Sequence, residues 1–264
     1  MLHTGVFAGP VAGLQYQTPT HRGLTNEKGE FQYRAGERVA FLIGSTPIGS
    51  AMGAPRLTLA DLISRVDGSL HKLLDAGLTN IARFVCSLDR DGDLNGGVVI
   101  DPRVHDLIGR RRIRFRHDIS FAGMDQDLVR EFEQDPLVAT LLEELSAAGV
   151  FSARTPRRLC SAATARNEVR RHILGILRFK DVKVPLANGL FVYADIFRPA
   201  REGRFPVIMN CGPYGRAFHH HSIADDADFE AHEAMEERYF HGNPEGQVFE
   251  NHETANTVDW VPHD

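Results

Sequence analysis

The sequence has few cysteines and no long apolar run, and each shortage excludes a class of protein. Its three cysteines, Cys86, Cys160 and Cys211, have no short spacing between them. An odd number at such spacings indicates neither a disulfide framework nor a cysteine-based zinc site. No stretch of about 18 consecutive apolar residues occurs, and no basic region followed by an apolar run opens the chain. We therefore expect a cytoplasmic protein that does not span a membrane.

Charge gives no general attraction to nucleic acid. Thirty Lys and Arg residues stand against 35 Asp and Glu residues, for a formal net charge of −5. This balance provides no overall basic field, so we expect no nucleic-acid partner. A local run of arginines at 110–116 is the exception. Because Ile113 and Phe115 alternate with arginines, the run predicts a strand with one solvated face rather than a phosphate site.

The first 178 residues predict an α+β module. From Gly13 to Ile48, apolar residues alternate with polar ones and glycines mark the turns, which predicts a small β-meander or part of a sandwich. The motifs Gly13-Leu-x-Tyr and Gly29-Glu-Phe-x-Tyr resemble a bacterial-type β-rich module, and that resemblance implies no reaction. The alternating apolar residues are Leu14, Tyr16, Phe31, Tyr33, Val39, Phe41 and Ile43.

Helical spacing replaces the alternation at Thr58. Thr58 and Asp61 can form a capping box, and apolar residues follow on one face as far as Leu74. A short second helix follows, for which Thr79 is the expected cap. Its apolar face consists of Ile81, Phe84, Val85 and Leu88.

Two further helical regions complete this module. Residues 125–148 predict a helix pair broken at Pro136, because Asp135 suits the N-cap and proline suits the first helical position. Another helix is expected from about Ala162 to Leu177, with its arginines facing outward. The buried stripe of the second helix in the pair should be Leu137, Val138, Leu141, Leu142 and Leu145.

Near Phe179 the apolar period changes from 3.6 to 2, and we place a domain boundary at about residue 178. Two strands, Phe179–Leu186 and Leu190–Phe197, flank Asn188-Gly189, a pair typical of tight hairpin turns. The short apolar segment Phe205–Asn210 predicts a buried central strand.

Residues 179–264 carry several motifs in a fixed order. They are the hairpin, an Ala194-Asp-x-x-Arg-Pro strand, the apolar segment ending in Pro213-Tyr-Gly, and a final stretch from Glu250 to Trp260-Val-Pro. Together they resemble the N-terminal segment of the cocaine-esterase/NonD family of X-prolyl dipeptidyl-peptidase-like α/β-hydrolases. The resemblance implies that the α+β module is followed by an incomplete, truncated α/β-hydrolase sheet that has only its first strands.

The same resemblance implies an activity. The chain would be the N-terminal part of a serine hydrolase or acyltransferase acting on small-molecule ester, amide or acyl substrates. Tyr214 would donate its hydroxyl to the oxyanion of the acyl-transfer intermediate. The nucleophile of the family lies in Gly-x-Ser-x-Gly, which the sequence lacks; Gly49–Gly53 places its serine in the wrong position.

The catalytic Ser-Asp-His is thus not contained in this chain, which we expect to be inactive alone. The alternative is a non-catalytic remnant or accessory protein whose N-terminal module mediates interaction. An incomplete sheet would expose an apolar edge in either case, and such an edge favours self-association.

Two sets of polar residues contain the residue types that bind metal ions, but neither set has the spacing that a metal site requires. Asp89, Asp91, Asp93 and Asn95 begin a calcium-loop pattern, but Ile100 occupies the position of the bidentate glutamate. Histidines are frequent after residue 218, but none has the pairing of a zinc site. We expect no metal and no cofactor. These histidines are His219, His220, His221, His232, His241, His252 and His263.

Overall fold

The computed structural model describes residues 1–63, 75–94, 96–115, 125–152, 156–211 and 260–261. The chain divides into two compact units, Met1–Arg170 and Arg171–Asp264. The sequence-based boundary at about residue 178 stays a prediction. Among the described residues, none of the helices has the length and apolar character needed to cross a membrane.

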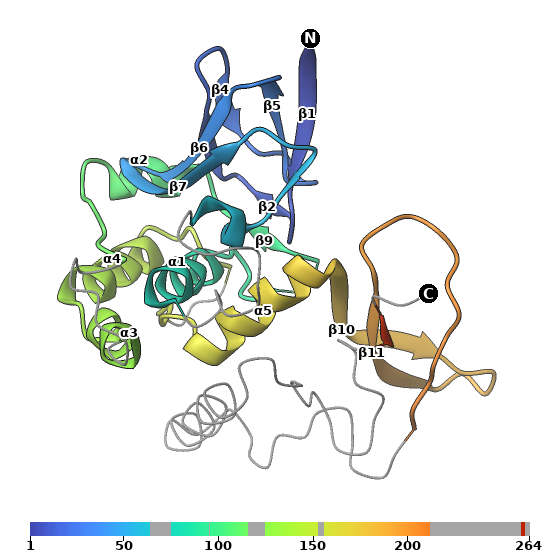
Figure 1. The fold of residues 1–264 in the computed structure, drawn as a ribbon. Coiled ribbons are helices and arrows are strands. Elements are labelled where there is room, and N and C mark those ends of the chain that lie inside the picture. Colours follow the sequence, from blue (N-terminus) through green and yellow to red (C-terminus); the bar gives the residue numbers. More distant parts are fainter. Residues whose placement is uncertain (64–74, 95, 116–124, 153–155, 212–259, 262–264) are drawn as a thin grey trace. The chain divides into compact units, whose positions relative to one another are not determined.

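The first unit begins with two small β-sheets (Figure 1). One has four antiparallel strands in the order β4-β3-β6-β7, and the other has the order β5-β1-β8, with β1 antiparallel to β5 and parallel to β8. A separate parallel pair joins β2 to β9. The bounds are β1 Leu2–Phe7, β2 Val11–Ala12, β3 Gln15–Gln17, β4 Arg22–Leu24, β5 Glu30–Arg34, β6 Arg38–Ile43, β7 Thr46–Met52, β8 Arg56–Leu57 and β9 Val98–Val99.

An aromatic cluster joins the two sheets into one core. Phe7 and Phe31 come from the three-stranded sheet, and Phe41 comes from the four-stranded sheet. The ring centroid of Phe41 lies 4.8 Å from that of Phe7 and 5.3 Å from that of Phe31, both in edge-on arrangements that aromatic rings favour. The predicted alternation is confirmed, since all seven alternating apolar residues are buried.

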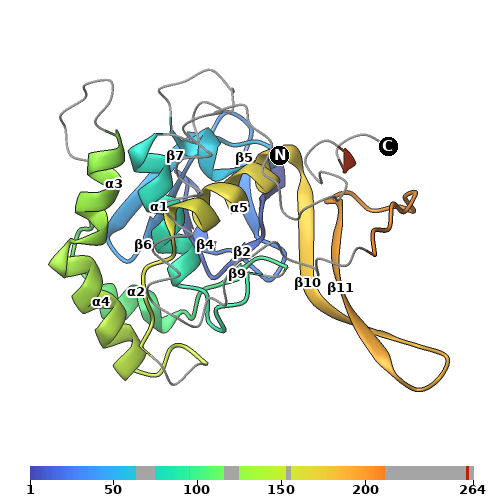
Figure 2. The ribbon, with the colours of Figure 1, turned by 90° about the horizontal axis from the view of Figure 1, so that it is seen from below.

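Helices make up the rest of the first unit, which is therefore mixed α+β as the sequence predicts. Figures 1 and 2 show α1, α3 and α4 near one another on one side of the strands. The bounds are η1 Leu59–Leu62, a 3₁₀ helix, α1 Ala76–Ser87, α2 Arg103–Ile108, α3 Asp125–Glu133, α4 Pro136–Ala147 and α5 Ala162–Leu174.

The predicted break between α3 and α4 is confirmed. Pro136 is the first residue of α4, and the Asp135 carboxylate accepts a hydrogen bond of 2.8 Å from the Leu137 N–H. This bond satisfies one of the unpaired N–H groups at a helix start. Of the predicted stripe, Leu137 is half-buried and the other four residues are buried: Val138, Leu141, Leu142 and Leu145.

Two predicted helix starts had different outcomes. The capping box of Thr58 and Asp61 is confirmed, and it begins the 3₁₀ helix η1. The expected continuation over residues 64–74 lies outside the described residues. Thr79 does not cap α1, because the helix starts earlier: Asp75 is the N-cap and accepts a hydrogen bond of 2.9 Å from the Leu78 N–H.

The last helix and the arginine run differ from the predictions. α5 ends at Leu174 rather than Leu177, because Gly175 takes a positive φ of 70° and β10 starts directly afterwards. Arg166 and Arg171 of α5 are buried, not outward. Residues 111–115 form no strand although burial alternates along them. The Thr46 hydroxyl bonds the Arg111 carbonyl and the Ile113 N–H, so a side chain replaces a strand ladder there.

The second unit contains the predicted hairpin. β10, Ile176–Pro185, pairs antiparallel with β11, Phe191–Pro199. Gly189 takes a φ of 82°, and the Leu186 N–H donates to the Leu190 carbonyl at 2.8 Å to close the turn. Positive φ is the conformation for which Asn-Gly turns are selected.

The predicted central strand at Phe205–Asn210 is wrong for this chain. The segment forms no strand, and its apolar side chains are exposed: Val207 by 86%, Ile208 by 59% and Met209 by 83%. A central strand is buried only when other strands flank it. The described residues supply no strand beside this segment.

The aromatic cluster gives the first testable prediction. Phe41→Ala should lower the free energy of unfolding by about 3–5 kcal/mol, because it leaves a cavity between the two sheets. Met52→Ala is the control, since Met52 ends β7 and is 50% exposed. Urea unfolding of both variants measures the difference, and equal midpoints would contradict the shared core.

Candidate functional site

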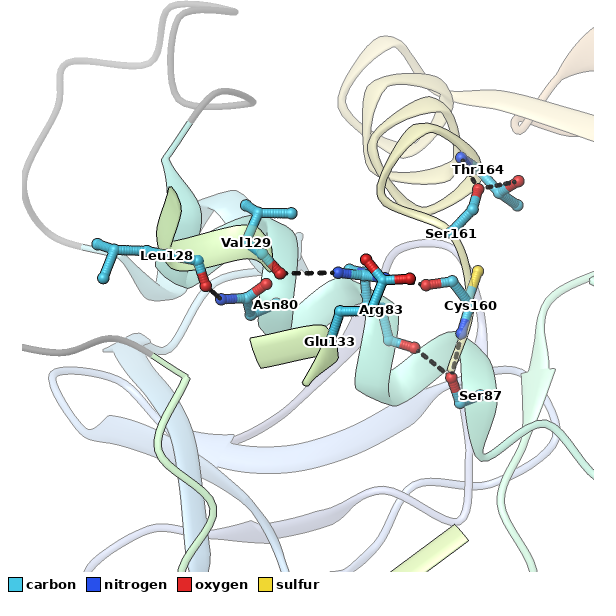
Figure 3. Close-up of polar contacts among 9 residues, drawn as sticks. All are labelled: Asn80, Arg83, Ser87, Leu128, Val129, Glu133, Cys160, Ser161 and Thr164. Atoms are coloured by element: carbon cyan, nitrogen blue, oxygen red, sulfur yellow. Dashed lines mark hydrogen bonds and ion pairs between the residues drawn. The ribbon is translucent and has the colours of Figure 1, made fainter. Parts of the chain in front are cut away.

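A buried guanidinium, that of Arg83 on α1, contacts two other segments of the chain (Figure 3). Its Nε donates to the Cys160 carbonyl at 2.7 Å, and one terminal nitrogen donates to the Val129 carbonyl at 3.1 Å. The other lies 3.4 Å from a carboxylate oxygen of Glu133, which is half-exposed. A buried cation is tolerated only with such partners. Arg83 therefore binds α1 to α3 and to the segment that precedes α5.

The hydroxyls of Ser87 and Ser161 form hydrogen bonds with the segment around Cys160. The Ser87 hydroxyl donates to the Arg83 carbonyl and accepts from the Cys160 N–H, each at 2.7 Å. The Ser161 hydroxyl accepts from the Thr164 N–H at 3.0 Å and so caps the start of α5. Both backbone groups of Cys160 are thus hydrogen-bonded to side chains of α1.

Asn80 extends this polar face toward the start of α1. Its amide nitrogen donates to the Phe115 carbonyl at 3.0 Å and to the Leu128 carbonyl at 3.3 Å, as Figure 3 shows for Leu128. Arg166 of α5 adds a bond of 3.0 Å from its Nε to the Thr79 hydroxyl. Sequence patterns do not identify these polar residues, because polar side chains of an amphipathic helix are expected on its exposed face.

The acidic loop after α1 uses its carboxylates within the protein. Asp89 is buried, and its two carboxylate oxygens accept from the Val99 N–H at 2.7 Å and the Gly92 N–H at 2.8 Å. The Asp91 carboxylate accepts from the Asp93 N–H at 2.9 Å. Within the ranges that the structure describes, no group of three or more His, Cys, Asp or Glu residues could hold a metal ion.

Burial makes Asp89 an unusual acid. Desolvation raises the pKa of Asp89 from 3.8 to about 6, and the Asp91 carboxylate adds to this rise, while the Val99 N–H opposes it. The pKa of Asp91 is lowered, chiefly because it accepts a hydrogen bond from Asp89. The two carboxyl groups therefore shift each other's pKa in opposite directions.

The three cysteines are free and differ in exposure. Cys86 on α1 is buried, Cys160 is half-buried, and Cys211 is exposed. The Cys160 thiol and burial together raise the pKa of Cys86 well above its usual value. The sequence spacing between Cys86 and Cys160 gave no sign of this neighbourhood.

Most of the residues that the sequence singles out for catalysis or metal binding, Asn95 among them, are outside the part of the chain that the structure describes. Tyr214 and the histidines from His219 to His252, with His263, lie outside the described residues. Asp89, Asp91 and Asp93 are described, and they bond their own loop. No family model, curated protein or solved structure matches the chain. The described polar cluster holds helices and loops together.

The raised pKa of Asp89 predicts how stability depends on pH. Because the folded protein binds this proton more tightly than the unfolded chain, the contribution of Asp89 to stability falls as pH rises from about 4 to about 6 and is constant above about 7. The Asp89→Asn variant has no titrating carboxyl group at this position. The free energy of unfolding of the wild type, relative to this variant, should therefore decrease across that window.

Urea unfolding at several pH values between 4 and 7 measures this difference. Asp101 forms an ion pair with Arg103, which lowers the pKa of Asp101. Its carboxyl group therefore loses its proton below this pH range. Asp101→Asn is therefore the matched control and should leave the slope of stability against pH unchanged there. Parallel pH curves for the wild type and Asp89→Asn would contradict the raised pKa.

Proposed function

We propose that residues 179–264 contribute the first strands of an α/β-hydrolase domain of the cocaine-esterase/NonD kind. The chain then acts as the N-terminal part of a serine hydrolase or acyltransferase for small ester, amide or acyl substrates. Residues 1–178 form an accessory module in this proposal. The catalytic serine, aspartate and histidine come from outside this sequence.

The observation that carries this proposal is the exposed apolar surface of the β10–β11 hairpin. Four side chains of β11 are between 41% and 49% exposed: Phe191, Val192, Tyr193 and Ile196. Successive residues of a strand point to opposite faces, so Val192 lies on the face opposite Phe191 and Tyr193. A hairpin with apolar residues on both faces is typical of a sheet covered on both sides, as in α/β folds.

The segment after the hairpin supports the same proposal. Val207, Ile208 and Met209 are apolar and exposed, whereas a strand of that composition normally lies inside a sheet. Tyr214 follows this segment in the sequence, and the resemblance gives it the role of an oxyanion donor. A hydroxyl at that position can donate to a developing oxyanion, which is the largest electrostatic contribution to acyl transfer.

Partners and location follow from the same proposal. The small-molecule substrate binds only to the completed domain, and the exposed hairpin favours self-association in its absence. The three free thiols suit a reducing compartment, so we propose a cytoplasmic location. We propose neither a cofactor nor a nucleic-acid partner.

The protein in its native cells provides the direct test. Antibody capture of this chain, followed by labelling with a fluorophosphonate probe, should give one labelled serine within a Gly-x-Ser-x-Gly peptide. That serine should lie on the same polypeptide or on one bound to it. In the captured enzyme, Tyr214→Phe should lower kcat by roughly 100–1000-fold, the usual cost of an oxyanion donor. Capture without any labelled serine would favour the accessory interaction protein instead.

A complementary prediction concerns the 264-residue protein by itself. It should not hydrolyse nitrophenyl acetate above a heat-denatured control, because an acyl-enzyme requires a nucleophile beside a base. Tyr214→Phe should give the same background rate as the wild type. Turnover that survives repurification and disappears in Tyr214→Phe would contradict the assignment of the nucleophile to another part of the enzyme.

A further inference from the structure

Cys86 and Cys160 are distant in sequence, and the fold fixes them beside each other. The Cys160 carbonyl accepts from Arg83 Nε and the Cys160 N–H donates to the Ser87 hydroxyl, each at 2.7 Å. Both partners belong to the turn of α1 that contains Cys86. Both hydrogen-bonding groups of the Cys160 backbone are therefore tied to residues around Cys86.

The geometry of an α-helix places Cys86 on the side of α1 that meets Cys160. Residues three and four apart share one helix face, so Cys86 and Ser87 both lie on the face of Arg83. The Cys160 side chain is also the largest cause of the raised pKa of Cys86, ahead of burial. The two cysteines are therefore neighbours in the fold.

The two thiols differ in access. Cys86 is buried, with 9% of its surface exposed, whereas Cys160 is half-buried. Reactive cysteines are commonly accessible and have a second thiol beside them that completes a disulfide. This pair has that division, with Cys160 as the accessible thiol and Cys86 as the second one.

We propose that Cys86 and Cys160 form a reversible dithiol–disulfide pair that hydroperoxides oxidise. This inference stands independently of the hydrolase proposal, since every residue that carries it lies in the first unit. The modification links α1 covalently to the segment that leads into α5.

The oxidation proceeds in two steps. The Cys160 thiolate attacks one peroxide oxygen, the O–O bond breaks, and the departing oxygen takes a proton to leave as water or an alcohol, so that Cys160 becomes a sulfenic acid. The Cys86 sulfur then attacks the sulfenic sulfur, the S–O bond breaks, and hydroxide leaves with the Cys86 proton as water. Two electrons pass from the thiols to the peroxide, and an external dithiol reverses the reaction.

Peptide mapping of the intact 264-residue protein tests the pair directly. The reduced protein is treated with a small excess of hydrogen peroxide, remaining thiols are alkylated, and the product is digested with trypsin without reductant. The expected result is a disulfide between peptides 84–90 and 159–166, which carry Cys86 and Cys160, lost again on treatment with dithiothreitol. Peptide 205–216, which carries Cys211, should be recovered alkylated.

Three other results would overturn the proposal. They are a disulfide to Cys211, oxidation of Cys160 beyond the sulfenic acid while Cys86 stays a thiol, and recovery of Cys86 and Cys160 fully alkylated. Mapping of the wild type decides the question without any variant. The peptide map of the wild type therefore tests the proposal even if a cysteine substitution prevents folding.

Variants separate the roles of the two sulfurs. In Cys86→Ser, peroxide should leave a sulfenic acid on Cys160 that dimedone traps, whereas Cys160→Ser should leave Cys86 reduced. Cys211→Ser is the matched control and should form the disulfide as the wild type does. Because the disulfide closes a long loop, oxidation should raise the midpoint of thermal unfolding by about 5–10 °C in the wild type and in Cys211→Ser alone.

Discussion

The buried guanidinium of Arg83 is the interaction on which the helical half of the first unit depends. Through Val129, Glu133 and Cys160 it contacts both α3 and the segment before α5, and Asn80 and Ser87 of α1 add hydrogen bonds to the same two segments. Removing this cation would leave two carbonyls without their donor, and an unsatisfied buried acceptor costs about 1–3 kcal/mol. A hydrocarbon side chain could fill the space, but it could not specify which carbonyls meet there. Arg83 thus sets the arrangement of these segments as well as their stability.

Much of this fold could be predicted from sequence, because period and caps are local signals. Apolar residues recur at every second position within the short strands of residues 13–48, so the buried faces of these strands follow from the pattern. Asp135-Pro136 marks a helix start by the chemistry of two adjacent residues, and Asn188-Gly189 marks a turn in the same way. Each signal acts within a few residues, so the tertiary environment does not alter it.

Several features that sequence reasoning missed depend on contacts between distant segments. Arg166 looks like a solvated helix residue, yet the fold buries it and gives it the Thr79 hydroxyl. Residues 205–210 have the composition of a central strand, but burial needs neighbouring strands that no local pattern reveals. Of the candidate site, only the identity of Tyr214 could be argued from sequence, through resemblance. The proximity of Cys86 to Cys160 required the fold itself.

The parallel pairing of β2 with β9 has a consequence for the order in which the ribosome delivers the chain. Val11 and Ala12 leave the ribosome early, while their partners Val98 and Val99 follow much later. At a synthesis rate of about 5–20 residues per second, β2 waits about 4–17 s for its partner. During that interval its backbone groups are open to pairing with other chains. The speed of translation through residues 13–98 therefore sets how long each nascent chain is vulnerable to aggregation.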